Sequence, residues 1–531
     1  MMKKLLFILL AALSFNGVSQ TYNLSDFKPK ELHNSIRLNY ILIDQPSKTY
    51  DYGDGSTYTL QPRMGLFGLN YNFPLNDWLY TGAGFHGAVY GDQGGLFTLG
   101  VNLGVNTQLY KNLYFDVNVH VGGGGGFRSL VDGGGIIYPN VGLQYKNNGY
   151  AIGLQYGYVN FFTGIQKGDN ISFFVEIPTS LRTASYKHAQ KSFTVNDETK
   201  DKVWTKPAVK SVQQITFDYL FPIGSSRNDG IGNFNNTTPL TQTLSLLGFE
   251  YQRYLNKNTF VYAHVDAMYG GLRAGFMDVF FGIGKNFVET EYVNFFAKAG
   301  IGAAGGRIFP EGGLTMYPSV GADVKVTKNF GLGLHGGYHK SVSGTFEAYT
   351  AGFSLKYYGL SGGIKDPYTA EKIKYINTQG IQIGVQNQTY FDVAILDKPQ
   401  YKEHDLELIA LKINYDLNHR FYIAGEASFA YLGGAGGYAH GIFGLGIKSN
   451  KFLNDNFSLF AEAAAGVAGG GGVDSGEGVL VRPTAGINYH LNDNFSFTAS
   501  GGQMWSPYGN VNSTNLNIGF TYGLSILNAK K

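Results

Sequence analysis

The sequence predicts an all-β protein of transmembrane antiparallel β-barrel architecture, with about 24 strands in three eight-strand repeats. Three observations lead to this prediction. Apolar and polar residues alternate along many stretches of about 9–12 residues, the length of a tilted strand that crosses a bilayer. A glycine-rich hairpin occurs three times, and a leucine–asparagine turn recurs upstream of each copy.

The glycine-rich hairpin sets the spacing of the repeats. Each copy reads as a strand, a glycine loop and a second strand that carries a proline, at Pro139, Pro318 and Pro483. The asparagines of the recurring turn, Asn76, Asn256 and Asn418, precede these prolines by 63, 62 and 65 residues. Two landmarks that keep their spacing three times indicate three divergent tandem repeats. Because proline lacks the ladder donor, each proline is expected near the outer rim or at a bulge.

The repeats fall between charged segments. A secretory signal peptide is expected over residues 1–19, where Lys3 and Lys4 precede an apolar run and cleavage falls before Gln20. No later apolar stretch reaches ~18 residues, so no membrane-spanning helix is expected. The remaining segments are a polar lead (20–34), repeat 1 (35–181), a lysine-rich periplasmic linker (182–211), repeat 2 (212–358), a second such linker (359–380) and repeat 3 (381–531).

Alternation with a period of two places the individual strands. In residues 97–109, Phe97, Leu99 and Val101 face one side, while Thr98, Gly100 and Asn102 face the other. The strands of the first repeat centre near residues 39, 68, 85, 103, 118, 141, 155 and 176. Tight Asn-rich turns alternate with longer loops rich in Gly, Asp and Ser, so each repeat contains an even number of strands.

The composition of the two strand faces predicts which one meets lipid. The face opposite the apolar stripe carries mostly Gly, Ala, Asn, Ser, Thr and Gln, unlike the charged surface of a water-soluble sheet. Aromatic residues gather beside the turns, as in the girdle of a membrane barrel. They are Phe73, Trp78, Tyr80, Tyr110, Tyr114, Tyr254, Phe260, Phe421 and Phe457. The alternative is a secreted all-β protein with these stripes in its core.

Composition excludes several other classes. Glycine makes up 75 of 531 residues but has no Gly-X-Y period, which excludes collagen. The 77 Tyr and Phe residues, with 15% charged residues, exclude a disordered chain. A net charge of +3 gives no reason to expect nucleic acid as a partner. Because cysteine is absent, disulfides, thiolate metal sites and a cysteine nucleophile are impossible.

These features together resemble the outer-membrane β-barrel superfamily of Gram-negative bacteria. Each repeat is similar to a small OmpA- or OmpW-like eight-stranded barrel, and a signal cut before Gln resembles those of Bacteroidota. The resemblance is architectural, and no family motif supplies functional residues. It implies a location in the cell outer membrane, with outer-membrane lipid, lipopolysaccharide and the barrel-assembly machinery as partners. The lysine-rich linkers could contact periplasmic or membrane proteins.

Charged and histidine residues on the inward face are the candidate site. They are Asp116, His120, His264, Asp266, Lys298, Glu426, Glu462 and Arg482. One interpretation is a catalytic dyad such as His120 with Asp116. The other is a polar network in the lumen, where charges pair because an unpaired buried charge is costly. We favour the network, with Glu462 and Arg482 as an expected pair, and predict no catalytic, cofactor or metal site.

Two questions stay open at this point. The strands could close as three narrow barrels, which is slightly favoured, or as one wide barrel of 24 strands. The expected function is a non-enzymatic structural or scaffold role in the outer membrane. The alternatives are a passive pore or transporter, and a barrel enzyme that acts on lipid or peptide.

Overall fold

The protein is seen in a computed structural model, which describes residues 21–22, 30–51, 57–126, 130–147, 149–194, 209–230, 233–308, 312–361, 375–396 and 404–530. The prediction of an all-β barrel fold is confirmed. In the described ranges the only helical element is the 3₁₀ helix η2 (Tyr186–His188). The same ranges contain no helix with the length and hydropathy needed to span a membrane.

Antiparallel pairings close the long strands into rings of eight. The first ring contains β2 (Lys30–Asp44), β5 (Arg63–Pro74), β6 (Leu79–Tyr90), β7 (Phe97–Tyr110), β8 (Leu113–Gly125), β9 (Ile136–Asn147), β10 (Tyr150–Phe161) and β11 (Lys167–Ser185), and β11 pairs back onto β2. Every strand centre predicted for the first repeat lies within one of these strands.

The second and third rings follow the same order along the chain. The second contains β13 (Val209–Pro222), β16 (Leu244–Tyr254), β17 (Thr259–Gly270), β18 (Phe276–Glu289), β19 (Val293–Gly306), β20 (Leu314–Lys325), β21 (Phe330–Ser341) and β22 (Glu347–Ser361), which pairs with β13. The third contains β23 (Tyr375–Val393), β24 (His404–Asp416), β25 (Phe421–Leu432), β26 (Ala439–Lys448), β27 (Phe457–Gly469), β28 (Val479–His490), β29 (Phe495–Trp505) and β30 (Asn512–Lys530), which pairs with β23.

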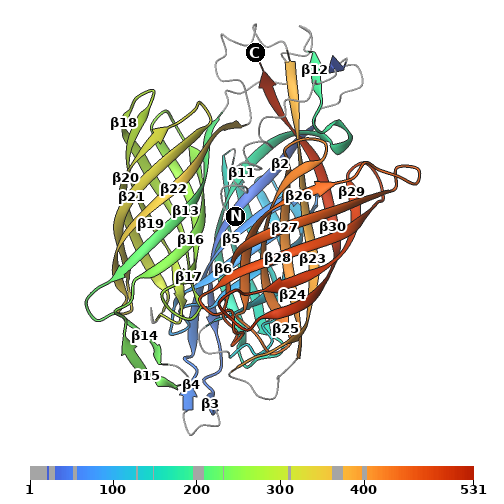
Figure 1. The fold of residues 1–531 in the computed structure, drawn as a ribbon. Coiled ribbons are helices and arrows are strands. Elements are labelled where there is room, and N and C mark those ends of the chain that lie inside the picture. Colours follow the sequence, from blue (N-terminus) through green and yellow to red (C-terminus); the bar gives the residue numbers. More distant parts are fainter. Residues whose placement is uncertain are drawn as a thin grey trace.

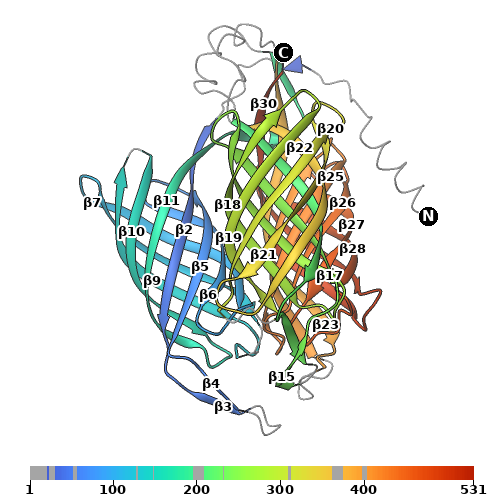
Figure 2. The ribbon, with the colours of Figure 1, turned by 90° about the vertical axis from the view of Figure 1, so that its left-hand side faces the viewer.

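The rings stand side by side with their short turns at one end. Figure 1 shows the C-terminus and β12 (Ser192–Thr194) at this end. The opposite end carries the longer loops with two small hairpins, β3 (Thr49–Asp51) with β4 (Thr57–Thr59), and β14 (Arg227–Gly230) with β15 (Asn233–Pro239). In Figure 2 the first ring, in blue to teal, lies beside the second ring, in green to yellow.

The first and third rings are joined at the short-turn end. Strand β11 runs past its own ring and pairs with β30, and β12 pairs with β23 and with β1 (Thr21–Tyr22). The predicted linker 182–211 is therefore wrong in its first residues, because β11 extends to Ser185 and η2 and β12 follow. The strands β11, β23 and β30 are 19 residues long, well beyond a bilayer crossing. The last residues of this linker, 209–211, belong to β13 (Val209–Pro222). The second predicted linker, 359–380, is wrong at both ends, because β22 extends to Ser361 and β23 begins at Tyr375. Residues 195–208 and 362–374 lie outside the described residues.

A polar cluster fixes this junction. The Tyr186 hydroxyl donates to Asp416 Oδ2 at 2.7 Å, and Lys448 Nζ donates to Asp416 Oδ1 at 2.7 Å. Burial, together with the negative charge of Asp416, raises the pKa of the Tyr186 hydroxyl. The phenol therefore stays protonated and acts as a hydrogen-bond donor between the rings.

The recurring asparagine of the short turns has a local explanation. Asn76 Oδ1 accepts hydrogen bonds from the backbone amides of Trp78 and Leu79, at 2.9 and 2.7 Å. Asn256 and Asn418 cap their own turns in the same way. The side-chain carbonyl replaces a backbone acceptor in the turn, which is the known preference of asparagine. The landmark thus marks the turn between the second and third strands of each ring.

The recurring proline interrupts one ladder of each ring. Pro139 pairs with Val119 on one side, but the pairing of β9 with β10 skips from Asn140 to Ile137. The pairings of β20 with β21 and of β28 with β29 skip the same two positions at Pro318 and Pro483. A residue without an amide hydrogen cannot donate to the ladder, so the neighbouring strand separates there.

Candidate functional site

Polar and charged side chains point into each ring while apolar side chains point outward. Strand β10, for example, alternates exposed and buried residues along its whole length. Eight strands enclose only enough space for side chains. All of the predicted lumen residues are buried: Asp116, His120, His264, Asp266, Lys298, Glu426, Glu462 and Arg482.

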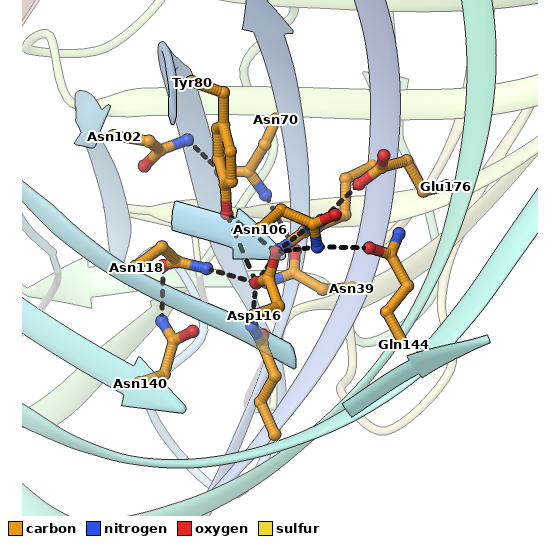
Figure 3. Close-up of polar contacts among 12 residues, drawn as sticks. Asn39, Asn70, Tyr80, Asn102, Asn106, Asp116, Asn118, Asn140, Gln144 and Glu176 are labelled. Atoms are coloured by element: carbon orange, nitrogen blue, oxygen red, sulfur yellow. Dashed lines mark hydrogen bonds and ion pairs between the residues drawn. The ribbon is translucent and has the colours of Figure 1, made fainter. Parts of the chain in front are cut away.

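Asp116 and Arg37 form the centre of the first ring. Both terminal nitrogens of Arg37 donate to the Asp116 carboxylate at 3.1 Å, and Arg37 Nε donates to Glu176 at 2.7 Å. The guanidinium lies over the ring of Phe174 with a separation of 4.0 Å, a cation–π contact. Figure 3 shows how further donors surround the carboxylate, namely Tyr80, Asn106 and Asn118. The charges are thus paired and saturated with hydrogen bonds.

His120 and Asp116 lie on the same inward face but do not bond to each other. His120 Nδ1 lies 2.7 Å from Asn102 Oδ1, and its ring meets the His86 ring edge to face at 4.8 Å. The carboxylate of Asp116 is turned toward Arg37. The dyad interpretation needs a histidine oriented by the carboxylate, and that contact is missing between these two described residues.

The second ring holds a chain of acidic and histidine side chains. Lys298 Nζ contacts Glu250, and His264 Nδ1 lies 3.0 Å from the same carboxylate. His264 Nε2 lies 2.8 Å from Asp266, and His335 Nε2 lies 2.5 Å from Asp218. Sequence reasoning named three of these residues and did not find Glu250, Asp218 or His335.

Three of these residues have the donor types of a metal site. Asp218, His264 and Asp266 offer ligand atoms that lie within 4.8 Å of one another. Histidine nitrogen and carboxylate oxygen are ordinary ligands of a divalent ion. However, both nitrogens of His264 already face carboxylates, so the ion pairs alone account for the arrangement.

In the third ring, Arg482 and Glu426 form the main ion pair. Arg482 Nη2 donates to Glu426 at 2.7 Å, and Nη1 donates to the Tyr390 hydroxyl at 3.0 Å. Lys412 Nζ instead contacts Glu462 at 2.7 Å. The predicted Glu462–Arg482 pair is therefore wrong. Arg482 stands opposite Ala464 in the ladder, and its long side chain crosses the narrow lumen to β25.

Side chains leave little free space within the first and third rings. The cavity beside Arg37 and His120 in the first ring has a volume of about 20 Å³, room for about one water. A cavity of about 270 Å³ lies in the third ring near its short-turn end, beside Lys412 and His490. These volumes fit packed lumens better than water-filled channels.

Glycine loops lock the three rings together at the long-loop end. The loop after the third strand of each ring meets the end of the fifth strand of another ring. Gly95 of the first ring abuts Gly305 and Gly306 of the second, Gly275 of the second abuts Gly469 of the third, and Gly437 of the third abuts Gly125 of the first. The three contacts therefore follow a cyclic order with pseudo-threefold symmetry.

Close backbone approach explains why these positions are glycine. Gly95 has φ +89°, and a Cβ atom there would collide with the backbone nitrogen of Gly306. The amide of Gly437 donates to the carbonyl of Gly124 at 3.0 Å, and that of Ala274 donates to Gly476 at 2.7 Å. A side chain at these glycine positions would prevent the two backbones from approaching so closely. The glycine hairpins of the sequence are thus contacts between rings.

Outward apolar side chains pack between the rings beside this glycine contact. Val89, Phe97 and Leu99 of the first ring form one buried cluster with Val279 and Ala303 of the second and Phe429 of the third. Aromatic pairs join the rings two by two, at centroid distances of 5.5 to 6.3 Å. They are Phe67 with Phe281, Phe85 with Phe429 and Phe249 with Phe443.

Beyond this cluster the rings border a half-open cavity of about 2320 Å³. Its walls are outward apolar residues of all three rings. They include Leu69, Phe85, Ile215, Leu247, Phe249, Leu355, Leu411, Ile413, Ile423 and Phe443. The glycine loops close one end, and at the other end the cavity reaches Lys210, Lys325 and Lys328 of the second ring. We call this space the central cavity.

Sequence reasoning missed the central cavity and the glycine contacts. It noted the glycine runs at the ends of the fifth strands but not their counterparts after the third strands, at Gly94-Gly95, Gly270-Gly271 and Gly433-Gly434. The joint recurrence of both glycine sets was the signal that could have indicated contacts between repeats.

Comparison with known proteins gives only distant likeness. No family model matches the chain, and no curated protein matches it. Among solved structures, OpdQ of Pseudomonas aeruginosa is 8% identical with a TM-score of 0.20, covering 93% of this chain and 98% of that one. The siderophore receptor PirA of Pseudomonas aeruginosa is 8% identical with a TM-score of 0.26, and the match covers 93% of this chain and 81% of the receptor. PirA of Acinetobacter baumannii has the same identity and TM-score, and the match covers 95% of this chain and 81% of the receptor. Likeness at this level supports no inference about function.

Proposed function

We propose that this chain is an integral outer-membrane protein in which each ring is a separate closed barrel, and that it acts as a non-enzymatic scaffold. The observation that carries the proposal is the inside-out distribution of side chains. Large apolar residues are exposed on the outer faces, as at Leu154 (59%), Val320 (60%) and Phe520 (60%). Charged residues fill the interiors. Only lipid or detergent covers such outer faces favourably.

The internal symmetry supports an origin from three tandem repeats. Each ring has eight strands, the asparagine-capped turn, the interrupting proline and the same glycine contact to another ring. A closed ring of eight strands pairs its strands with one another, leaves no open edge and needs no plug. The single ring of 24 strands would instead require pairing across all three repeats.

The scaffold role is favoured over catalysis by the state of the buried groups. Asp116, Glu426 and Glu250 each accept bonds from a buried arginine or lysine. Groups engaged in this way hold the barrel interior together and are not free to attack or protonate a substrate.

The location is tested by fractionation. The mature chain should sediment with the outer membrane and resist extraction by carbonate or high salt, because its apolar outer faces require lipid. Immunoblots of the fractions provide the measurement. Recovery of the chain in the soluble periplasmic fraction would contradict the proposal.

The choice between scaffold and pore is tested by conductance. Purified protein inserted in planar bilayers should give no large stable current steps, because side chains fill the lumens. The alternative, a passive pore or transporter, predicts reproducible steps. A trimeric porin recorded under the same salt conditions controls for insertion, and such steps from this chain would favour the alternative.

A further inference from the structure

We propose that the central cavity binds an anionic phospholipid, with the acyl chains between the barrels and the phosphate at the lysine end. This inference rests on the proposed membrane location. The cavity, with a volume of about 2320 Å³, is larger than the ~300–1000 Å³ of ordinary small-molecule pockets. Its size and apolar walls suit hydrocarbon chains.

The walls explain why hydrocarbon is the favoured content. A large apolar space left empty loses dispersion contacts along its whole lining. Water inside it would find few polar partners among Leu247, Phe249 and Ile413. Each methylene that moves from water into such a site strengthens binding about fourfold. The packed glycine loops close the far end, so chains must enter from the lysine end or from the side.

The lysine end supplies charge complementarity for a phosphate. Lys210 and Lys325 lie on the inward face of the second ring, at its mouth, and also line the cavity. Lys210 Nζ lies 2.7 Å from Glu289, and Lys325 Nζ lies 3.7 Å from the same carboxylate. Lys328 is exposed in the turn after β20 and also lines the cavity. Lys356 also lines the cavity here and pairs with Asp323 at 2.6 Å. Four lysines against two carboxylates leave two positive charges at this end.

The end with these lysines is the short-turn end of the barrels. In membrane barrels the short turns are periplasmic, so the lysines lie at the depth of the periplasmic headgroups. A phospholipid of that leaflet can place its phosphate at Lys328 and its chains along Ile413 and Phe249. Lysine binds phosphate as a point charge, which does not require a fixed orientation of the headgroup.

Gly441 offers a way to fill the cavity without disturbing the barrel. It lies on the outer face of β26 and lines the cavity, and a Cβ atom there would meet nothing within 4 Å. Gly425 of β25 also lines the cavity, and its nearest neighbour is Phe443 at 3.6 Å. Gly441→Trp, or Gly425→Leu as a milder variant, should occupy space that the acyl chains need.

The experiment measures phospholipid on the full-length mature chain after purification and exhaustive detergent exchange. Native mass spectrometry with phosphorus analysis should find retained phospholipid on the unmodified protein. Displacing two bound methylenes corresponds to about a tenfold loss of affinity. The Gly441→Trp and Gly425→Leu variants should therefore lose most of the retained phospholipid. Gly149→Trp is the matched control, because Gly149 also has free space but lies in an exposed turn away from the cavity.

A second arm tests the headgroup with defined lipids. Delipidated protein is mixed with micelles that contain phosphatidylglycerol or phosphatidylcholine. The unmodified chain should prefer phosphatidylglycerol, and Lys210→Gln with Lys328→Gln should remove this preference. Lys257→Gln with Lys285→Gln is the control, since these lysines belong to the same barrel but do not line the cavity.

The outcomes separate the two proposals. Equal phospholipid on Gly441→Trp, Gly425→Leu and Gly149→Trp variants that all retain heat-modifiable mobility would overturn the site. So would an unmodified chain that fractionates with the outer membrane yet retains no phospholipid and shows no preference for phosphatidylglycerol. The proposed location would survive either result. Failure of the chain to fractionate with membranes would overturn the location itself.

Discussion

Replacing Arg482 by alanine should destabilise the third barrel by roughly 3–5 kcal/mol, the cost of leaving a buried charge without its partner. Arg482 is buried and pairs with Glu426 at 2.7 Å, and its other terminal nitrogen donates a hydrogen bond to the Tyr390 hydroxyl. The double variant Arg482→Met with Glu426→Gln should recover much of this loss, because it leaves no uncompensated carboxylate. The free energy of unfolding is measured by denaturant titration in detergent micelles, followed by circular dichroism.

An exposed pair in the same chain gives the control for this experiment. Arg63 Nε and Asp44 lie 3.0 Å apart, but both side chains are more than half exposed. Arg63→Ala should therefore change stability by less than about 1 kcal/mol. If Arg482→Ala and Arg63→Ala have equal small effects, the lumen of the third barrel is hydrated and the pair is not buried in solution.

Local patterns in the sequence predicted the strands well. Period-two alternation depends only on which face of a strand each residue occupies, so it located all eight strands of the first ring. The Asn76 landmark was found for a local reason too, because its side chain bonds to amides two and three residues ahead. The extension of β11 to Ser185 was missed, since it depends on pairing with β30 in another ring.

Partners of the buried charges could not be predicted in the same way. Sequence reasoning paired Glu462 with Arg482 because they lie on neighbouring strands. Ladder register, however, fixes only which backbone positions face each other. Long side chains in a narrow lumen reach strands that are not adjacent, as Arg482 reaches Glu426 on β25. The glycine contacts between rings were also hidden, because a glycine that turns a loop and a glycine that admits a neighbouring backbone look alike in sequence.

The largest expected effect concerns a fragment of the chain. A polypeptide from residue 375 to residue 531, which contains β23 to β30, should fold alone in detergent micelles. In the full chain β23 and β30 pair continuously from Tyr375 with Lys530 to Tyr390 with Asn515, so the fragment has no open edge of its own. Closure satisfies the backbone donors and acceptors without a neighbouring barrel. Heat-modifiable gel mobility and β-sheet circular dichroism provide the measurement.

A shorter fragment that ends at residue 511 is the matched control. It lacks β30, so β23 and β29 lose their shared partner and become two unpaired edges. Exposed apolar edges of this kind template association with other chains, and the shorter fragment should therefore aggregate. The fragment of residues 375–531 could also fail to refold while the full-length chain refolds under the same conditions. That result would show that the rings depend on one another. The glycine contacts around Gly437 and Gly469 would then be required for folding as well as for packing the three barrels together.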